Sequence, residues 1–304
     1  MIKEVLEKTD ALEEKIQALL AEEEKTEEVK VLQEEKKRLL ESCKDLEPGD
    51  RVFLARHPRR PHVEDFVSAL FTDFFEQKGD HLYDEDRSIY GGIARFHGRP
   101  VTVLGHRKGR TVEENLSCNF GMTCPEGYRK AKRLMEQAEK FDRPIITFVD
   151  TPGAYPGLEA EQHGQGEAIA KNLAFMSSLH VPVIAVVTGE GSSGGALGIC
   201  VANKILMLEN AIYSVLSPEG FATILWKDSS RAAEAAKVMK LTAKDLKEAN
   251  VADEVVPESL GGAQDDPESL YKALDRILEK ALAYYEGMSR HEIRKDRLSK
   301  FRNI

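Results

Sequence analysis

The chain has 304 residues, of which 41% are hydrophobic and 31% are charged, and its formal net charge at pH 7 is −9. A chain of this kind can bury a sizeable core, and it contains neither an apolar run long enough to span a membrane nor the basic and then apolar order of a signal peptide, so a cytoplasmic protein is expected. Its acidic balance argues against a general nucleic-acid binder, and its four scattered cysteines (Cys43, Cys118, Cys124 and Cys200) predict neither a metal site nor disulfide bonds.

Residues 1–47 carry 15 acidic and 9 basic side chains around apolar residues at helical spacing, and this spacing is interrupted near "AEEEKTEE". We expect an N-terminal helical extension here, made of two amphipathic helices that can pair as a hairpin. Because no residue type typical of catalysis stands out in it, a solvated appendage is favoured over a dedicated arm for partner binding.

Strands and helices alternate in the main part of the chain, which we place at residues 48–263. Alternating apolar residues in "GGIARFHGRPVTVLGHRKG" predict a hairpin of two strands with Gly98 at its turn. The stretch "PEGYRKAKRLMEQAEKF" has the spacing of an amphipathic helix, and "RPIITFVDTPGAYPG" predicts a buried strand that ends in a loop. Asp150, at the end of that strand, is interpreted as a turn former.

The same order recurs further along the chain. After a second helix, "VPVIAVVTGEGSSGG" predicts a buried strand followed by a glycine loop, and "KILML" and "AIYSV" predict two more strands. This pattern is typical of an α/β protein whose sheet has parallel neighbours. Because ligands bind beyond the carboxyl ends of such strands, the loops at 151–157 and 189–195 are expected to open onto one site. Residues 264–304 predict a C-terminal helical tail whose basic end frays or binds a partner.

Three chemistries fit the glycine-rich stretch "GEGSSGGALG". The spacing Gly189-x-Gly191-x-x-Gly194 matches a dinucleotide fingerprint, and Glu209 lies at the right distance downstream to bind a ribose. This first interpretation predicts a nicotinamide-dependent oxidoreductase. A glycine loop that is preceded by an equivalent loop deep in the chain is unusual for that fold, so the match is weak.

The second chemistry is a hydrolase, because Gly191-x-Ser193-x-Gly195 matches a nucleophile elbow, although the histidine that follows Ser193 is His291 in the charged tail. The third uses the backbone itself. Gly194 and Gly195 precede the predicted helix "ALGICVAN", and amides without side chains at a helix start can form an oxyanion hole, with Gly191 giving the turn its freedom. Close packing of a helix on the sheet would explain the same glycines.

An ordered series of motifs runs through the main part of the chain: "LARHPRRP" (54–61), "GGIARFHGRPV" (91–101), "GHRKGR" (105–110), "NFGMTCPEGYRKAKRLM" (119–135), "PIITFVDTPGAYPG" (144–157), "GQGEAIAKNL" (164–173), "GEGSSGGALG" (189–198) and "YSVLSPEGFATILW" (213–226). From about residue 50 to residue 263 the chain thus resembles the alpha subunit of the bacterial acetyl-coenzyme A carboxylase carboxyltransferase. Two departures stand out. Ser192 replaces an expected glycine, and Gln162 and His163 replace an acid and an arginine, which puts charge pairing at that helix start in doubt.

The resemblance implies a crotonase-like α/β fold of repeated strand-strand-helix units. It also implies transfer of a carboxyl group from carboxybiotin to acetyl-CoA, which forms malonyl-CoA for fatty acid synthesis, with propionyl-CoA or a related acyl-CoA as an alternative acceptor. The amides of Gly194 and Gly195 would then stabilise the charge on the ureido oxygen of biotin, and Gly153 and Ala154 would shape the biotin pocket. Arg107, Lys108 and Arg110 are candidates for binding the phosphates of CoA or an acidic carrier surface.

The resemblance further implies that the chain works with other proteins. A beta subunit with a zinc ribbon would hold acetyl-CoA, a biotin carboxyl carrier protein would deliver carboxybiotin, and a separate biotin carboxylase would use the ATP. The family suggests an assembly of two alpha and two beta chains, in which this chain holds no metal and is inactive alone. A non-enzymatic assembly subunit remains the other possibility for a chain of this kind.

Overall fold

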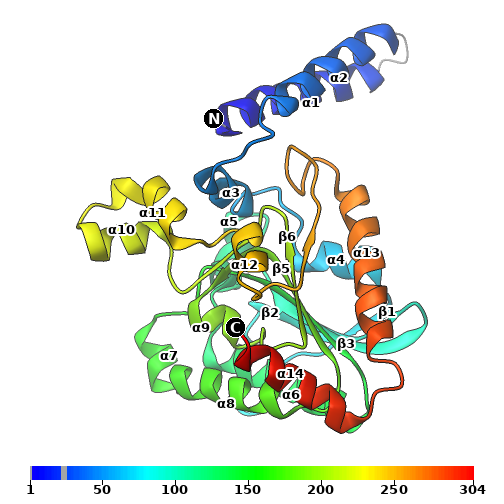
Figure 1. The fold of residues 1–304 in the computed structure, drawn as a ribbon, viewed down its shortest axis with the longest axis vertical. Coiled ribbons are helices and arrows are strands. Elements are labelled where there is room, and N and C mark those ends of the chain that lie inside the picture. Colours follow the sequence, from blue (N-terminus) through cyan, green and yellow to red (C-terminus); the bar gives the residue numbers. More distant parts are fainter. Residues whose placement is uncertain (1, 22–25) are drawn as a thin grey trace.

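The longest apolar runs of the sequence form the central strands of one mixed sheet. The computed structural model describes residues 2–21 and 26–304. Within them, eight strands form a sheet of order β1-β2-β3-β4-β5-β6-β8, and β7 pairs with the end of β5 (Figure 1). Strands β3, β4, β5, β6 and β8 run parallel to one another, which confirms the predicted parallel neighbours. The strands are β1 (Thr72–Glu76), β2 (Ile89–Phe96), β3 (Arg99–His106), β4 (Ile145–Thr151), β5 (Val183–Ser192), β6 (Lys204–Leu208), β7 (Ile212–Ser214) and β8 (Glu254–Val256).

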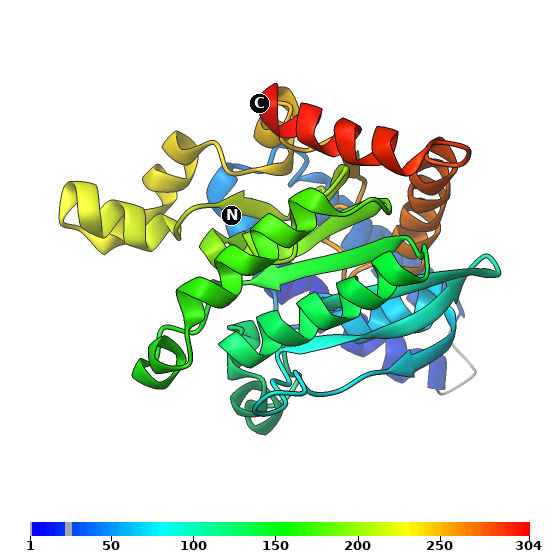
Figure 2. The ribbon, with the colours of Figure 1, turned by 90° about the horizontal axis from the view of Figure 1, so that it is seen from below.

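Helices cover both faces of this sheet (Figure 2). Helices α6 and α8 pack against each other on one face, where α6 contacts β2 and β3, while α4 and α13 pack together on the other face. The helices are α1 (Ile2–Ala21), α2 (Thr26–Glu41), α3 (Pro48–Ala55), α4 (Val63–Leu70), α5 (Val112–Ser117), α6 (Pro125–Lys140), α7 (Leu158–Gln162), α8 (Gln165–Ser178), α9 (Ser193–Leu197), α10 (Pro218–Trp226), α11 (Ala232–Met239), α12 (Ala243–Glu248), α13 (Pro267–Tyr284) and α14 (Arg290–Arg302). None of the helices in the described ranges is long and apolar enough to cross a membrane.

The predicted hairpin is confirmed in its register and in its turn. Phe96 lies opposite Arg99, which leaves His97 and Gly98 as a two-residue loop with φ angles of 48° and 78°. Positive φ at both positions is the mark of the turn that matches the twist of paired strands. The two buried strands and the two long helices expected after the hairpin are also present, as β4, β5, α6 and α8.

The predicted glycine loop at 189–195 is wrong in its first half, because β5 continues through Ser192. A Cβ atom at Gly189 would overlap the carboxylate of Asp150, and one at Gly191 would lie 2.6 Å from the ring of Tyr213. These two glycines therefore allow close packing inside a strand. They do not form the phosphate-binding turn that a dinucleotide fingerprint needs, so this interpretation fails.

The N-terminal extension forms the expected pair of helices, α1 and α2, which pack along each other and project from the body (Figure 1). Part of the predicted interruption, residues 22–25, lies outside the described residues. The base of the hairpin is attached to the body, since Ile2, Leu6 and Leu40 pack with Leu54 of α3. An ion pair of 2.8 Å also joins Lys36 of α2 to Asp265 ahead of α13.

The expected helices of the C-terminal tail are present as α13 and α14, and both pack against the body of the chain. Helix α13 contributes Leu270, Leu274 and Leu278 to the main core. Helix α14 lies along α8 and buries Ile293 and Arg297. The guanidinium of Arg297 donates to four acceptors where α8 ends and β5 begins: the carbonyl oxygens of Met176, Leu179 and Val181 and the side-chain oxygen of Asn203.

Replacing Arg297 with methionine is expected to lower the free energy of unfolding by about 3 kcal/mol or more, because buried carbonyl oxygens lose their donors. Chemical denaturation monitored by circular dichroism measures this loss. Arg294→Met, at an exposed position of the same helix, is the matched control and is expected to change stability by less than about 0.5 kcal/mol. Equal stability of the two variants would contradict the assigned role of Arg297.

Candidate functional site

The carboxyl ends of β4 and β5 lie side by side, which brings together the two segments expected to share a site. Thr151 at the end of β4 pairs with Gly191 of β5. Beyond them, Gly195 is packed against the backbone of the first loop, since a Cβ atom there would lie 2.5 Å from the carbonyl carbon of Gly153 and 2.6 Å from the nitrogen of Ala154. Only glycine permits this approach.

The helix at this turn is shorter and starts earlier than predicted. Helix α9 begins at Ser193, which has φ of 56°, and ends at Leu197, so Gly194 and Gly195 lie in its first turn and do not precede it. No side chain caps the helix at Ser192. The amides of Gly194 and Gly195 therefore have no partner within the helix, as the first amides of any helix do not. Gly194 is half-buried and Gly195 is buried.

A cluster of charges lies at the ends of β4 and β5, where Asp150 and Glu190 are buried and Lys108 is partly buried. The ammonium of Lys108 lies 2.7 Å from Asp150 and 3.4 Å from Glu190. Asp150 also accepts a hydrogen bond of 2.9 Å from the amide of Glu190, and Arg56, the residue after α3, binds Glu190 at 2.6 Å. Asp150 is thus an ion-pair partner within β4, and its interpretation as a turn former is wrong.

Asp150 and Lys108 each shift the pKa of the other toward the charged form. Burial by itself would raise the pKa of Asp150, but the Lys108 ammonium outweighs burial and holds this pKa below its usual value. Burial likewise opposes the charge on Lys108, and its two carboxylate partners raise the pKa of the ammonium above its ordinary value. Asp150 and Lys108 are therefore charged at neutral pH, and Lys108 forms a bridge between strand ends.

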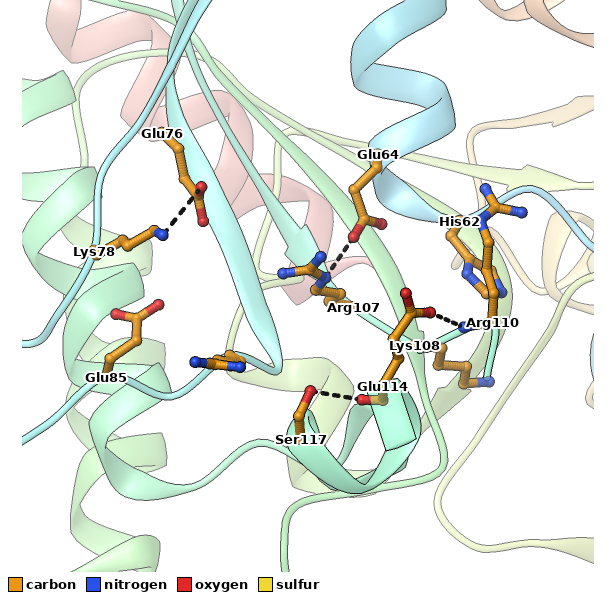
Figure 3. Close-up of a pocket in the computed structure, with 12 residues that line it drawn as sticks. His62, Glu64, Glu76, Lys78, Glu85, Arg107, Lys108, Arg110, Glu114 and Ser117 are labelled. Carbon is orange, nitrogen blue, oxygen red and sulfur yellow. Dashed lines mark hydrogen bonds and ion pairs between the residues drawn. The ribbon is translucent and has the colours of Figure 1, made fainter. Parts of the chain in front are cut away.

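One pocket of about 560 Å³ is lined in part by the predicted basic residues Arg107, Lys108 and Arg110 (Figure 3). Each of them already has an acidic partner. Arg107 points toward Glu64 at 2.5 Å, and Arg110 binds both oxygens of Asp65 at 2.5 and 2.6 Å. An anion that entered this pocket would have to compete with these carboxylates. Neither Gly194 nor Gly195 lines it.

Of the three residues that depart from the family pattern, His163 and Ser192 have identifiable surroundings in the structure and Gln162 does not. His163 lies 3.0 Å from Glu126, which also binds Arg129, so this helix start does take part in a polar network. Ser192 is buried at the end of β5, beside Ser214 of β7. Gln162 is exposed at the end of α7, and nothing in the structure explains it.

His106 lies at the end of β3 and is only 1% exposed. Neither ring nitrogen has a hydrogen-bond partner, and burial lowers the pKa of the imidazole to about 4. The backbone of Gly195 is close to it, and the Tyr128 hydroxyl donates to the Gly195 carbonyl at 3.4 Å. A neutral histidine thus lies behind the glycine turn.

Sequence reasoning missed Glu190 and Arg56. A signal for Glu190 existed, because a charged residue inside an otherwise apolar strand needs a buried partner. No such signal marks Arg56, which lies 134 positions away from Glu190. The described residues contain no group of three or more His, Cys, Asp or Glu that could hold a metal ion.

Known proteins resemble this chain in sequence, and solved structures resemble it in fold. A family model described as acetyl co-enzyme A carboxylase carboxyltransferase-like matches residues 2–304. The acetyl-coenzyme A carboxylase carboxyl transferase subunit alpha of Bacillus cereus is 52% identical over 92% of this chain and 86% of its own length. The protein of the same name from Clostridium acetobutylicum is 54% identical over 87% of this chain and 97% of its own length.

Two solved structures illustrate the shared fold. The transcarboxylase 12S with bound methylmalonyl-coenzyme A has a TM-score of 0.61 and 20% identity, over 74% of this chain and 42% of the transcarboxylase chain. A chain of a Pseudomonas malonate decarboxylase hetero-tetramer has a TM-score of 0.58 and 20% identity, over 69% of this chain and 84% of its own. The predicted crotonase-like α/β fold, with its mixed sheet and covering helices, is thereby confirmed.

The buried imidazole predicts a pH dependence of stability. Because the pKa of His106 is about 4 in the folded chain and 6.5 ordinarily, the unfolded chain takes up a proton first as the pH falls. Stability should therefore fall between pH 6.5 and 4, by up to about 1.4 kcal/mol per pH unit from this group. Denaturation curves of wild type and His106→Leu across this range should show a shallower slope in the variant. Parallel curves would refute the assignment.

Proposed function

The chain belongs to the acetyl co-enzyme A carboxylase carboxyltransferase-like family, and we propose that it transfers a carboxyl group from carboxybiotin to acetyl-CoA as the alpha subunit of this enzyme. The observation that carries this proposal is the identity of 52 to 54% with curated alpha subunits of two genera over nearly the whole chain. The product, malonyl-CoA, feeds fatty acid synthesis. The enzyme is a transferase of acyl-CoA and biotin substrates.

Carboxybiotin, delivered by a separate carrier protein, would supply the carboxyl group and leave negative charge on its ureido oxygen. We assign the amides of Gly194 and Gly195 to this oxygen, because they are free of helical partners and carry no side chains. Gly153 and Ala154 pack against Gly195 and thus form the adjacent wall. A missing donor in such an oxyanion hole costs about 3 kcal/mol of transition-state stabilisation.

The proton of the acetyl methyl group must pass to an acceptor. His106 is buried and neutral, and Lys108 is bound to two carboxylates, so neither of these side chains beneath the turn is available. The acceptor is therefore expected on the carboxyl donor itself, which becomes basic as it loses its carboxyl group. The C–N bond of carboxybiotin would therefore break first, releasing CO2 and leaving its electron pair on biotin. Biotin would then take the methyl proton, and the resulting enolate carbon would form the new C–C bond to CO2.

The basic residues divide into two roles. Arg107 and Arg110 are at the rim of the pocket and partly exposed, and we assign them to phosphates of CoA or to an acidic surface of the carrier. Lys108 instead holds Asp150 and Glu190, which makes it a positioning residue. Gly191 acts through its close packing on Tyr213, which sets the course of β5 into the turn.

The remaining participants follow from the same assignment. A beta subunit with a zinc ribbon would bind acetyl-CoA, a biotin carboxyl carrier protein would present carboxybiotin, and a separate biotin carboxylase would consume ATP. Two alpha and two beta chains would assemble in the cytoplasm. This chain would need no metal of its own.

The proposal is tested by an exchange assay in which the chain, mixed with a carboxyltransferase beta subunit, converts malonyl-CoA and free biotin to acetyl-CoA and carboxybiotin. Activity is expected only when both subunits are present. Absence of exchange with the wild-type pair would refute the function. Methylmalonyl-CoA in place of malonyl-CoA tests the acceptor, and faster exchange with it would assign a different acyl-CoA.

Gly195→Ala is expected to lower the exchange rate about a hundredfold or more, because its Cβ atom would press on the backbone of Gly153 and Ala154 and displace the oxyanion hole. Gly166→Ala is the matched control, since a Cβ atom at this position of α8 meets nothing within 4 Å. Thermal unfolding verifies that both variants fold. Full activity of a folded Gly195→Ala variant would remove the glycine turn from the mechanism.

A further inference from the structure

The glycine turn of Gly194 and Gly195 has little in its own sequence to hold its shape. Helix α9 has five residues, no side chain caps its start, and its first three residues are a serine and two glycines. Glycine has the greatest backbone freedom of any residue, and a helix of this length is not stable alone. Because donors act on a developing charge only when they point at it, other parts of the chain have to set the direction of these amides.

Gly198, at the end of α9, shows where such support is applied. Its φ of −55° and ψ of −17° are helical angles that any residue adopts, so the backbone conformation does not require glycine here. A Cβ atom at this position would instead lie 2.5 Å from Cε1 of Tyr128. Tyr128 belongs to α6, and its side chain is fully buried. The absence of a side chain at Gly198 therefore lets the Tyr128 ring lie directly against α9.

Both peptide groups of Gly195 are held at this contact. The amide of Gly195 is coplanar with the carbonyl of Gly194, which accepts a hydrogen bond of 3.0 Å from the amide of Gly198. The carbonyl of Gly195 belongs to the next peptide group and accepts a long hydrogen bond of 3.4 Å from the Tyr128 hydroxyl. Tyr128 thus contacts Gly198 with its ring and Gly195 with its hydroxyl.

A buried asparagine fastens the same two helices together. Asn172 of α8 is 0% exposed, and its side-chain nitrogen donates to the carbonyls of Tyr128 and Gly198, each at 3.0 Å. Within the described part of the chain, its side-chain oxygen has no hydrogen-bond partner. A buried acceptor without a donor destabilises a fold. The two bonds that the nitrogen donates account for an asparagine at this place, because they join α6 to the end of α9.

We propose that Tyr128 is a positioning residue for the oxyanion hole and that Asn172 holds Tyr128 against α9. This inference rests on the proposed function, in which the amides of the turn bind the ureido oxygen of biotin. Burial raises the pKa of the Tyr128 phenol above its ordinary value, so the hydroxyl remains a donor at neutral pH. Tyr128 acts through the direction of the Gly195 peptide groups and not by contact with a substrate.

Tyr128→Phe is expected to lower kcat in the exchange assay about tenfold, because the turn loses one anchor and a shift of about 1 Å costs up to a hundredfold. KM for biotin should stay within about twofold, since the lost support acts in the transition state. Tyr285→Phe is the matched control. The Tyr285 hydroxyl is also lost from a buried residue, where it donates to Asp296 of α14 at 2.8 Å, so this variant should lose stability and keep its kcat.

Gly198→Ala tests the ring contact separately from the hydroxyl. The added Cβ atom would press on the Tyr128 ring, and the same pattern of lower kcat with an unchanged KM is expected. Gly166→Ala, whose Cβ atom meets nothing within 4 Å, is its matched control and should keep full activity. Thermal unfolding well above the assay temperature shows that each variant is folded when it is assayed.

Nuclear magnetic resonance reports on the Gly195 carbonyl directly. Glycine precedes alanine only at 153–154, 195–196 and 262–263. The full chain, labelled with carbon-13 at glycine carbonyls and nitrogen-15 at alanine, therefore gives three signals when each amide is correlated with the carbonyl before it. Tyr128→Phe is expected to move the Gly195 carbonyl signal upfield, because this oxygen loses a donor. The Gly262 signal should stay in place as the internal reference.

The outcomes separate the two proposals. Normal kcat of a folded Tyr128→Phe variant would overturn the positioning role and leave the function intact. An unmoved Gly195 signal would also overturn it, because the hydroxyl would then not hold this carbonyl. An equal loss of kcat in Tyr285→Phe would do the same by revealing a general effect of stability. A wild-type pair without exchange would refute the function, and the role of Tyr128 would fall with it.

Discussion

The buried charges of Lys108, Asp150 and Glu190 are the constraint on which the site depends. They come from the segment after β3, from β4 and from β5, so a single ammonium holds three neighbouring strand ends together. Removal of the Lys108 ammonium would leave the buried carboxylate of Asp150 without its ion-pair partner, which is far more costly than loss of an exposed pair. Gly189 is part of the same arrangement, because a side chain there would overlap Asp150.

This arrangement explains why a region so rich in charge offers so few reactive side chains. The carboxylates and the lysine are used on one another, and His106 is neutral and buried behind the turn. The turn that follows β5 offers backbone amides at Gly194, which is half-buried, and at Gly195, which is buried. A backbone donor has a fixed direction and needs no proton of its own, which suits stabilisation of a transient charge on a substrate.

The same cluster extends outward through Arg56 to Glu219 at the start of α10, the helix on which Ile224 and Leu225 are exposed. Arg56 therefore joins the end of β5 to the start of α10 through two ion pairs.

The sequence by itself determined the elements whose cause is local. Apolar periodicity predicted β4, β5, α6 and α8, Gly98 marked the hairpin turn, and the ordered motifs identified the family and the glycine pair. Only the tertiary structure decided which charges meet. Asp150 looked like a turn former, and Lys108, Arg107 and Arg110 looked like free cations, until their partners from distant segments were visible. Likewise, Gly189 and Gly191 were predicted to lie in a loop, because the side chains that pack against them, Asp150 and Tyr213, belong to other strands. Ion pairs and close packing join residues far apart in the chain, and no local pattern records them.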